Sequence, residues 1–313
     1  FWDNITIRLA TFAEEVHDHK KTRKKETLAF MPAIPIETLD DLRVEPYRDL
    51  KLRNLQRGGE FFIAEGKKVV ERLLDSDYET ASVFVSERHL EEWREKVPPT
   101  VPLYFAAQPV MNELVGFDFH VGVIGCGVRR PSTSLEQVLP ALVLPVQVLP
   151  AAAPRFTVVV CPNCDNPENL GAIIRISAAF GVDALLLGRG CADPFSRRVI
   201  RVSMGTAFKL PILEAADLAT DLLRLKQDWH FELAATVLEE GAERLEQAAR
   251  SARFGILLGN EDTGLGENWT QLCSRTLTIP MCRGTDSLNV AVTAGIMLHH
   301  FTREAVSPAS ASS

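Results

Sequence analysis

Polar residues stand at the start of the last apolar helix that the sequence predicts. Residues 279–300 read IPMCRGTDSLNVAVTAGIMLHH, which is a strand end, a polar loop and a helix rich in Ala, Val and Leu. Ser287 or Asp286 could cap this helix. Asn289 is different, because an asparagine within the first turn is a poor helix former and capping does not require it. We therefore predict that Ser287 and Asn289 belong to a site.

A second polar cluster has the pattern N-x-G-x-x-x-R at the start of another predicted helix. Its members are Asn169, Gly171 and Arg175. Asn169 alone is a good helix N-cap, so capping is the structural alternative for it. Arg175 lies among isoleucines, and a buried arginine must meet anions or carbonyls because an unpaired buried charge is strongly destabilising.

A third cluster, ILLGNEDTGLG, follows an apolar run. Its glycines, Gly259, Gly264 and Gly266, allow close backbone approach or positive φ. Glu261 comes directly after the predicted strand and could pair with an arginine. A plain glycine-rich turn is the structural alternative.

The elements around these clusters predict an α/β domain with a mainly parallel sheet. Apolar strands alternate with helices, and such a sheet is covered on both faces. Ligands bind beyond the carboxyl ends of its strands, where the polar clusters fall. We expect strands at 156–160, 183–188, 230–236, 253–261 and 275–280, and helices at 169–181, 214–227 and 289–304.

The preceding residues predict a smaller α/β domain at 31–130. An amphipathic helix begins near Glu65, with Val69, Val70 and Leu73 on one face. Strands are expected at 81–86, 102–106 and 119–128. Five prolines at 131–154 mark a stiff linker that lies along a domain surface. The remaining boundaries are a flexible segment at 1–30, a main domain at 155–306 and a disordered tail at 307–313.

The composition limits the classes of protein to which this chain can belong. The 313 residues are 46% apolar and 24% charged, with a net charge of −7. No segment has the ~20 uninterrupted apolar residues of a membrane span, so we expect a cytoplasmic protein. Six cysteines suggest reduced thiols rather than a disulfide framework. Cys161 and Cys164 form a C-x-x-C pair that lacks a second pair, which disfavours a metal or redox role. His299 and His300 are expected to be structural.

Together, in this order, the three clusters resemble the SpoU family of RNA ribose 2′-O-methyltransferases, within the knotted SPOUT superfamily. The family carries N-x-G-x-x-x-R, then L-G-x-E-x-x-G-L, then I-P-M followed by S-L-N-V, and all are present between residues 156 and 303. The segment SRRVIRVSMGTAFKLPI is also similar. The resemblance implies a C-terminal trefoil knot and an N-terminal substrate-binding domain. Arg283 departs from the family pattern, which commonly has Gly there.

The resemblance implies transfer of a methyl group from S-adenosylmethionine to a ribose 2′-hydroxyl, without a metal. Arg175 would contact the ribose or its phosphate and assist deprotonation, from the same or the opposite subunit. Glu261 would orient Arg175. The implied catalytic residues are Asn169, Arg175, Glu261, Ser287 and Asn289, and the implied cofactor-binding residues are Gly259, Ile279, Met281 and Leu288.

Expected partners are RNA and a second copy of the chain. Arg197, Arg198 and Arg201 give a basic segment suited to the RNA backbone, although a solvated helix face is the alternative. By resemblance, small residues of the last helix (Ala291, Ala294 and Gly295) would permit close packing in a homodimer. Ribosomal RNA is favoured over transfer RNA as substrate.

Two other classes of protein stay open. One is an RNA-binding protein with this fold and no methyl transfer, against which the intact polar clusters argue. The other is a nicotinamide-dependent dehydrogenase, which the missing G-x-G-x-x-G after the first strand disfavours.

Overall fold

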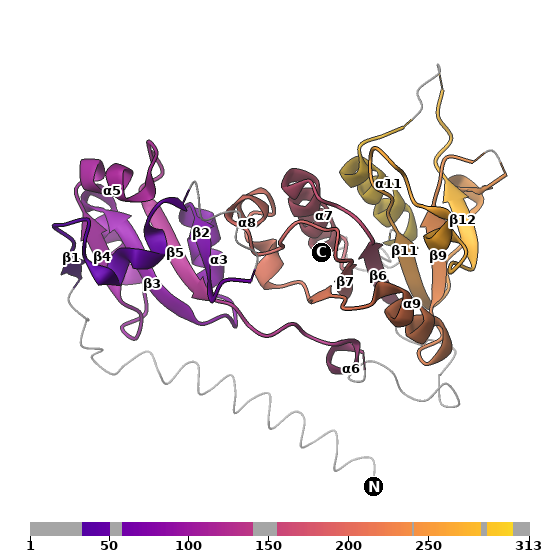
Figure 1. Ribbon diagram of the computed structural model, residues 1–313, viewed down its shortest axis with the longest axis horizontal. Coiled ribbons are helices and arrows are strands. Elements are labelled where there is room, and N and C mark those ends of the chain that lie inside the picture. Colours follow the sequence, from indigo (N-terminus) through magenta and orange to yellow (C-terminus); the bar gives the residue numbers. More distant parts are fainter. Residues whose placement is uncertain (1–32, 51–57, 140–154, 240, 283–286, 303–313) are drawn as a thin grey trace, which may run out of the picture.

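The computed structural model describes residues 33–50, 58–139, 155–239, 241–282 and 287–302, which form two α/β domains lying side by side (Figure 1). Several predictions lie outside the described residues. They are the flexible segment 1–30, the prolines at 140–154, the tail 307–313, and the positions of Arg283 and Asp286.

The N-terminal domain is built on a mixed sheet with the strand order β1-β4-β3-β5-β2. The predicted amphipathic helix is confirmed as α3 (Lys67–Leu74), with Val69, Val70 and Leu73 buried. The strand predicted at 119–128 is shorter and begins at Val123, because Gly122 turns the chain with a φ of 68°. The strands are β1 (Ile34–Pro35), β2 (Phe61–Glu65), β3 (Thr80–Ser86), β4 (Leu103–Ala106) and β5 (Val123–Val128).

Sequence reasoning missed β1, β2 and four short helical elements of this domain. The further helical elements are η1 (Leu42–Tyr47), η2 (Glu87–His89), α4 (Leu90–Lys96) and α5 (Gln108–Val115). Of the predicted linker, residues 135–138 form α6 (Leu135–Val138), which opens with a capping box between Ser134 and Gln137. Leu135 and Leu139 pack against the core of the C-terminal domain. This part of the linker therefore lies along a domain surface, as predicted.

The C-terminal domain contains a sheet in which every described pair of neighbouring strands is parallel, in the order β10-β12-β9-β11-β6-β7-β8. The parallel α/β architecture that the sequence predicted is confirmed. Strand order alone does not fix how the chain threads, so the trefoil knot stays a prediction. The strands are β6 (Phe156–Cys161), β7 (Ala184–Leu187), β8 (Ile212–Glu214), β9 (Glu232–Thr236), β10 (Glu243–Arg244), β11 (Arg253–Leu257) and β12 (Arg275–Thr278).

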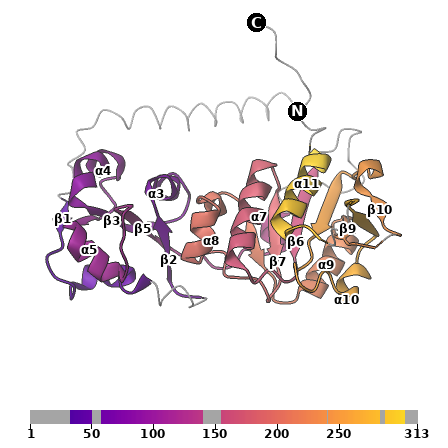
Figure 2. The same ribbon diagram turned by 90° about the horizontal axis from the view of Figure 1, so that it is seen from above.

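Helices cover both faces of this sheet (Figure 2). Val159 and Cys161 of β6 face one apolar core, which α7 and α11 cover, and Val158 and Val160 face the other, which α9 covers. Burial on both faces explains why this strand is apolar at every position except Thr157, whose buried hydroxyl accepts from Arg250 Nη1 at 3.0 Å. The α-helices are α7 (Pro167–Ala179), α8 (Arg197–Val202), α9 (Leu218–Gln227), α10 (Glu267–Thr270) and α11 (Val290–Thr302), with 3-10 turns η4 (Thr206–Phe208) and η5 (Leu245–Gln247).

The two domains are docked through apolar and charged contacts. Phe62 and Tyr78 of the first domain pack against Phe195 and Phe208 of the second, with ring centroids 5.4–5.9 Å apart. Arg129 of the first domain pairs with Asp193 of the second at 2.5 Å. Because aromatic burial and a partly buried ion pair act together here, the domains have a defined relative orientation.

Candidate active site

Asn169 lies at the centre of a hydrogen-bond network at the carboxyl ends of the strands. Its side-chain amide donates to Glu261 Oε1, and its Oδ1 accepts from Asn289 Nδ2 at 2.9 Å. The alternative that Asn169 caps α7 is wrong, because Asn166 Oδ1 accepts from the amides of Glu168 at 2.8 Å and of Asn169 at 3.4 Å. Capping by Asn166 leaves the buried Asn169 side chain available to join three separate segments.

The oxygen and the nitrogen of the Asn289 side chain have different roles. Its Oδ1 accepts from the amides of Ala291 at 2.9 Å and Val292 at 3.4 Å, so Asn289 is the N-cap of α11. The prediction that Asn289 lies inside the first turn, with Ser287 as a capping candidate, is therefore wrong. The Nδ2 that capping does not use donates to Asn169. The same residue thus fixes the helix start and extends the network.

Glu261 carries an oxygen that the network leaves without a partner. Oε1 accepts from Asn169, whereas Oε2 is buried and makes no hydrogen bond to the part of the chain that the structure describes. The turn that holds Glu261 closes through reciprocal backbone bonds between Asn260 and Gly264, at 3.0 and 2.8 Å. Gly264 has a φ of 67°, and a Cβ on Gly259 would lie 2.7 Å from the Gly264 carbonyl carbon. These two glycines permit the turn.

A cavity of about 390 Å³ adjoins this network. Glu261 and Ser287 contribute to its lining, and Thr236 and Thr293, which sequence reasoning missed, do so too. Its lining also includes all of the predicted cofactor-binding residues, which are Gly259, Ile279, Met281 and Leu288. Residues from three strand ends and from the start of α11 therefore meet at one hollow.

Arg175 lies apart from the network within the single chain. It is exposed on α7, while its neighbours Ile173 and Ile174 face the core. No hydrogen bond or ion pair joins its side chain to another described residue. The prediction that Glu261 orients Arg175 is not what the single chain shows, because Glu261 binds Asn169 instead. The expectation of a buried arginine is wrong because the helical period turns position 175 to solvent.

Gly171, the middle residue of the first motif, has a packing role. A Cβ at this position would lie 2.7 Å from the Val202 Cβ and 3.0 Å from the Val199 carbonyl oxygen. Glycine therefore lets α7 and α8 approach closely. This contact sets the position of α7, which carries both Asn169 and Arg175.

The basic segment is largely paired with carboxylates. Arg197 contacts Glu65 at 2.9 Å and lies over the Phe117 ring at 4.6 Å, with 17% of its side chain exposed. Burial lowers the pKa of the Arg197 guanidinium from its ordinary value. Arg201 reaches the other oxygen of Glu65 at 3.2 Å. Contrary to the prediction of an RNA-facing Arg197, this residue belongs to the domain interface.

Arg198 is the member of the segment that remains on the surface without a domain contact. It pairs with Glu168, and the two side chains are 45% and 61% exposed. Arg201, at 53% exposure, is also accessible despite its contact with Glu65. Any RNA contact of this segment therefore depends on Arg198 and Arg201.

The cysteine pair and His300 have structural surroundings, whereas His299 is exposed. Cys161 and Cys164 are buried in the core, and burial raises the pKa of Cys164 to about 12. His300 Nε2 lies 2.9 Å from the Ala248 carbonyl oxygen. No group of three potential metal ligands occurs among the described residues. Within the same residues, no helix is long and apolar enough to cross a membrane.

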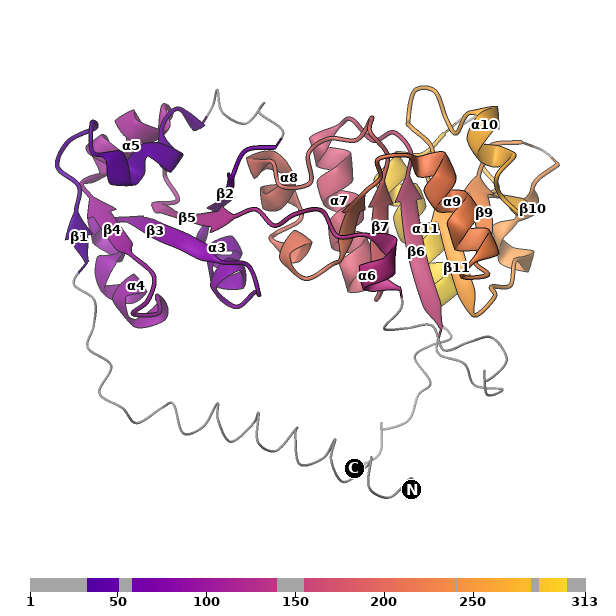
Figure 3. The same cartoon turned by 60° about the horizontal axis from the view of Figure 1, so that its bottom comes forward.

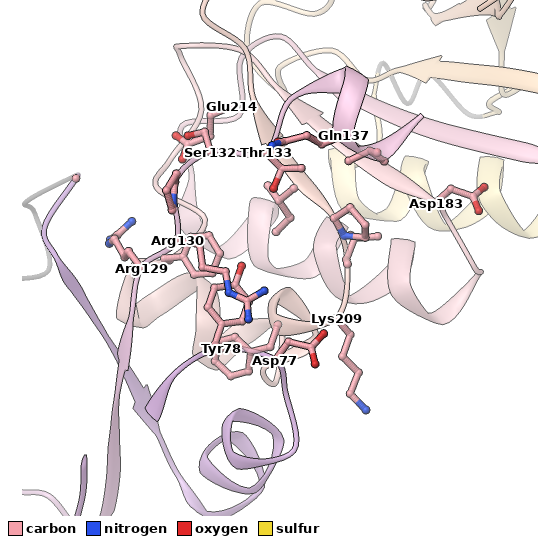
Figure 4. A pocket seen from close by; sticks show the side chains of 18 of the residues that line it. Asp77, Tyr78, Arg129, Arg130, Ser132, Thr133, Gln137, Asp183, Lys209 and Glu214 are labelled. Carbon is pink, nitrogen blue, oxygen red and sulfur yellow. The ribbon is translucent and has the colours of Figure 1, made fainter. Parts of the chain in front are cut away.

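A larger hollow of about 720 Å³ lies between the domains, away from these motifs (Figure 4). Arg130 lies over the Tyr78 ring at 4.6 Å, and Lys209 and Asp183 come from the other domain. None of the predicted catalytic or cofactor-binding residues lines this hollow. Size alone would therefore point to a different place from the one where the motif residues meet.

Known proteins are similar to this chain in both sequence and fold. The SpoU rRNA methylase family matches residues 157–299. An uncharacterized tRNA/rRNA methyltransferase of Mycobacterium bovis is 36% identical over 272 residues, which cover 84% of this chain and 90% of that protein. The 23S rRNA (guanosine-2′-O-)-methyltransferase RlmB of Acinetobacter baylyi is 30% identical, with 64% of this chain and 77% of that protein covered.

Solved structures of RNA methyltransferases are also similar to this chain. The AdoMet-bound rRNA methyltransferase from Sinorhizobium meliloti superposes with a TM-score of 0.71 at 26% identity, covering 88% of this chain and 99% of its own. An RNA 2′-O ribose methyltransferase superposes with a TM-score of 0.67 at 28% identity, covering 87% and 99%. Both matches extend over the two domains. Residues of all three motifs meet at the carboxyl edge of the parallel sheet, and this chain belongs to the SpoU rRNA methylase family.

Proposed function

We propose that this protein transfers a methyl group from S-adenosylmethionine to a ribose 2′-hydroxyl of ribosomal RNA. The observation that carries the proposal is the Asn169–Glu261–Asn289 network beside a cavity lined by Gly259, Ile279, Met281 and Leu288. Support for the reaction comes from RlmB, a relative named for guanosine-2′-O-methylation of 23S rRNA, and from the AdoMet-bound structural neighbour.

The cavity suits the cofactor in its chemistry. Ile279, Met281 and Leu288 offer apolar surface for an adenine ring and a methionine chain. Glu261 Oε2, buried and without a partner among the described residues, offers negative charge to a cationic ligand. When bound, S-adenosylmethionine supplies a methyl group that its sulfonium already activates. The protein must then align the ribose hydroxyl and help to remove its proton.

We assign different tasks to the chain's own residues. Asn169 and Asn289 fix the Glu261 carboxylate and the start of α11, so the edge of the cavity is preorganised. Ser287 is exposed at that edge and is placed to donate a hydrogen bond to substrate phosphate. Arg175 would bind the target ribose or its phosphate and assist deprotonation.

The exposure of Arg175 favours its action in the site of a second subunit. The small-residue argument for a homodimer needs correction, because Ala291 and Ala294 are buried within the chain, where α11 packs on α7. The outer face of α11 instead exposes Val292 at 50% and Ile296 at 37%. We propose that this apolar face pairs two copies and brings Arg175 of one to the cavity of the other.

Two measurements test the proposed function. Calorimetry with S-adenosylhomocysteine should show binding at micromolar concentration, and light scattering should give the mass of a dimer. Mapping of 2′-O-methyl positions in RNA from cells with and without the gene should identify a nucleotide in ribosomal RNA. A difference confined to transfer RNA would move the substrate class, and no difference together with no cofactor binding would favour a non-catalytic RNA-binding protein.

A further inference from the structure

A second hollow continues the cofactor cavity along the same edge of the sheet. Its volume is about 210 Å³, and it shares Asn260, Thr263 and Gly264 with the cavity. Asn163 and Trp269 form part of its lining. Figure 3 shows α10, which carries Trp269, together with the start of α7 at one end of the C-terminal sheet. The hollow therefore begins where the cofactor cavity ends.

The lining of this hollow is neutral and combines an aromatic ring with an amide. None of the described residues that line it has a charged side chain. Trp269 is partly exposed, and the exposed side chain of Asn163 makes no hydrogen bond to another described residue. Asn260, by contrast, is occupied, because its Oδ1 accepts from the amides of Asp262 at 3.0 Å and Thr263 at 3.3 Å. Asn163 thus offers a donor and an acceptor that the protein does not use.

An aromatic ring beside such an amide is suited to a single unpaired nucleobase. Unpaired RNA bases stack on aromatic side chains and present their edges to hydrogen-bonding groups. A charged lining would instead suit the phosphate backbone. The neutral lining and the small volume therefore favour one base over a stretch of backbone.

A third hollow extends the same path past Trp269. It has a volume of about 480 Å³ and shares Pro162 and Trp269 with the second. Arg189 lines it, and this loop continues to Asp193, which pairs with Arg129 of the N-terminal domain. The path thus leads from the cofactor cavity across the ends of β6 and β7 towards the docked domain.

We propose that the second hollow is a subsite for the nucleotide adjacent to the one that is methylated. Trp269 stacks on its base and Asn163 forms hydrogen bonds with the edge of the base, so the pair sets the sequence preference of the enzyme. Arg189 lies where the next phosphate would pass. This proposal rests on the proposed methylation of RNA and adds residues that select the sequence around the target.

A purely structural role for Trp269 must be separated from stacking. Trp269 packs against the edge of the core, as Leu265 and Leu272 also do, and its carbonyl oxygen accepts from Cys273 Sγ at 3.4 Å. Trp269→Ala could therefore disturb α10. Trp269→Phe keeps an aromatic ring, and Asn163→Ala removes only an exposed amide, so these two variants keep the test decisive.

The test uses the full chain, saturated with S-adenosylhomocysteine, and fluorescein-labelled single-stranded hexaribonucleotides of A, C, G, U or mixed sequence. Anisotropy should show that Trp269→Ala and Asn163→Ala each weaken binding of the preferred hexamer about 10-fold, because stacking on one base and a pair of hydrogen bonds to a base edge each have that order of effect. Trp269→Phe should bind within about threefold of the wild type, and Asn163→Ala should flatten the preference among the four bases.

Tryptophan fluorescence, measured with unlabelled hexamer, gives a readout that a structural role would not change. Stacking should quench the fluorescence of the wild type and of the control Trp229→Phe, because Trp229 is a buried residue with 9% exposure, but Trp269→Phe should lose this quenching. Three results would each overturn the subsite. They are wild-type affinity in both Asn163→Ala and Trp269→Ala, quenching in Trp269→Phe equal to that in the wild type, and no binding of any hexamer. Methyl transfer to ribosomal RNA by the wild type would still uphold the proposed function in those cases.

Discussion

Glu65 and Glu261 are both shielded carboxylates, but they are satisfied to different degrees. Glu65 lies between the domains with 5% of its side chain exposed, and each of its oxygens contacts an arginine, Arg197 or Arg201. Glu261 lies at the cavity, where one oxygen accepts from Asn169 and the other has no partner in the described part of the chain.

The difference shows which buried charge serves structure and which is available to a ligand. A carboxylate whose oxygens are both paired has its desolvation offset within the protein, and removal of either partner leaves an uncompensated charge. A carboxylate with a buried free oxygen beside a cavity keeps its hydrogen-bonding capacity for something that enters. We therefore expect substitutions around Glu65 to change stability and substitutions around Glu261 to change activity.

The largest effect is expected from Glu65→Ala, which leaves the partly buried Arg197 without its carboxylate partner. Unfolding by urea should show a loss of about 3 kcal/mol, most of it from Arg197, because Arg201 is half exposed and its pair is screened. Arg197→Met in the same chain should recover part of the loss by restoring a neutral side chain of similar length.

Glu92→Ala is the matched control for Glu65→Ala. Glu92 also contacts two cations, Lys67 at 2.6 Å and Lys96 at 2.9 Å, but on the protein surface. Exposed pairs contribute little because water and salt screen them. Equal unfolding free energies for Glu65→Ala and Glu92→Ala would refute the structural role of the interdomain pair.

Arg175→Ala tests the catalytic side of the comparison. Methyl transfer should fall about 100-fold or more if the arginine acts in the transition state, since each tenfold corresponds to about 1.4 kcal/mol. Binding of S-adenosylhomocysteine should be unchanged, because Arg175 is exposed and does not line the cavity within the chain. A tritiated-methyl assay and calorimetry separate the two readouts.

The outcomes for Arg175→Ala have distinct meanings. Near-full activity would show that the arginine is not catalytic. Loss of cofactor binding together with loss of activity would show a structural role. If Arg175 acts in the partner's site, mixing Arg175→Ala with an excess of an inactive Asn169→Ala variant should restore part of the activity, since a mixed dimer then contains one intact site.

Periodicity and strand ends were enough to predict the parallel sheet and the edge where the site lies. The mainly apolar run at 156–160 and the alternation of elements both follow from local sequence, because a strand buried on two faces has few polar positions, here only Thr157. The same reasoning missed β2, although the first four residues of FFIAE are apolar. This strand pairs with β5, which is distant in sequence, so only the tertiary partner reveals it.

Side-chain partners within the site were harder to predict. The sequence grouped Arg175 with Glu261, yet Asn169 is the partner that the fold brings to Glu261. The N-cap of α7 had a local signal that was overlooked, since Asn166 precedes Pro167 at the first helical position. The sequence predicts an RNA contact for Arg197 because its positive charge is evident there. Its partner Glu65 is 132 residues away in the chain, so the ion pair that occupies this charge is evident only in the fold.

Arg198→Glu isolates the accessible part of the basic segment. If Arg198 contacts a phosphate, the reversal should weaken RNA binding and reduce the slope of log affinity against log salt by about 1. Filter binding at several salt concentrations measures both, and Arg197→Glu would be uninformative because it disrupts the domain interface. An unchanged slope would place the RNA contact elsewhere, with the N-terminal domain as the next candidate.

The smallest effect is expected from substitutions that separate the two roles of Asn289, as the cap of α11 and as the partner of Asn169. Asn289→Ala removes the cap of α11 and the bond to Asn169, so thermal unfolding should show a loss of about 1 kcal/mol, and methyl transfer should also fall. Asn289→Ser keeps a capping oxygen but is too short to reach Asn169 Oδ1, which Asn289 Nδ2 now meets at 2.9 Å. Stability should therefore return to near the wild type while methyl transfer stays low. Recovery of both by serine would mean that only the helix start matters, and the network would then be a consequence of capping. Loss of activity with stability retained would show that the amide of Asn289 serves the site through Asn169 and Glu261.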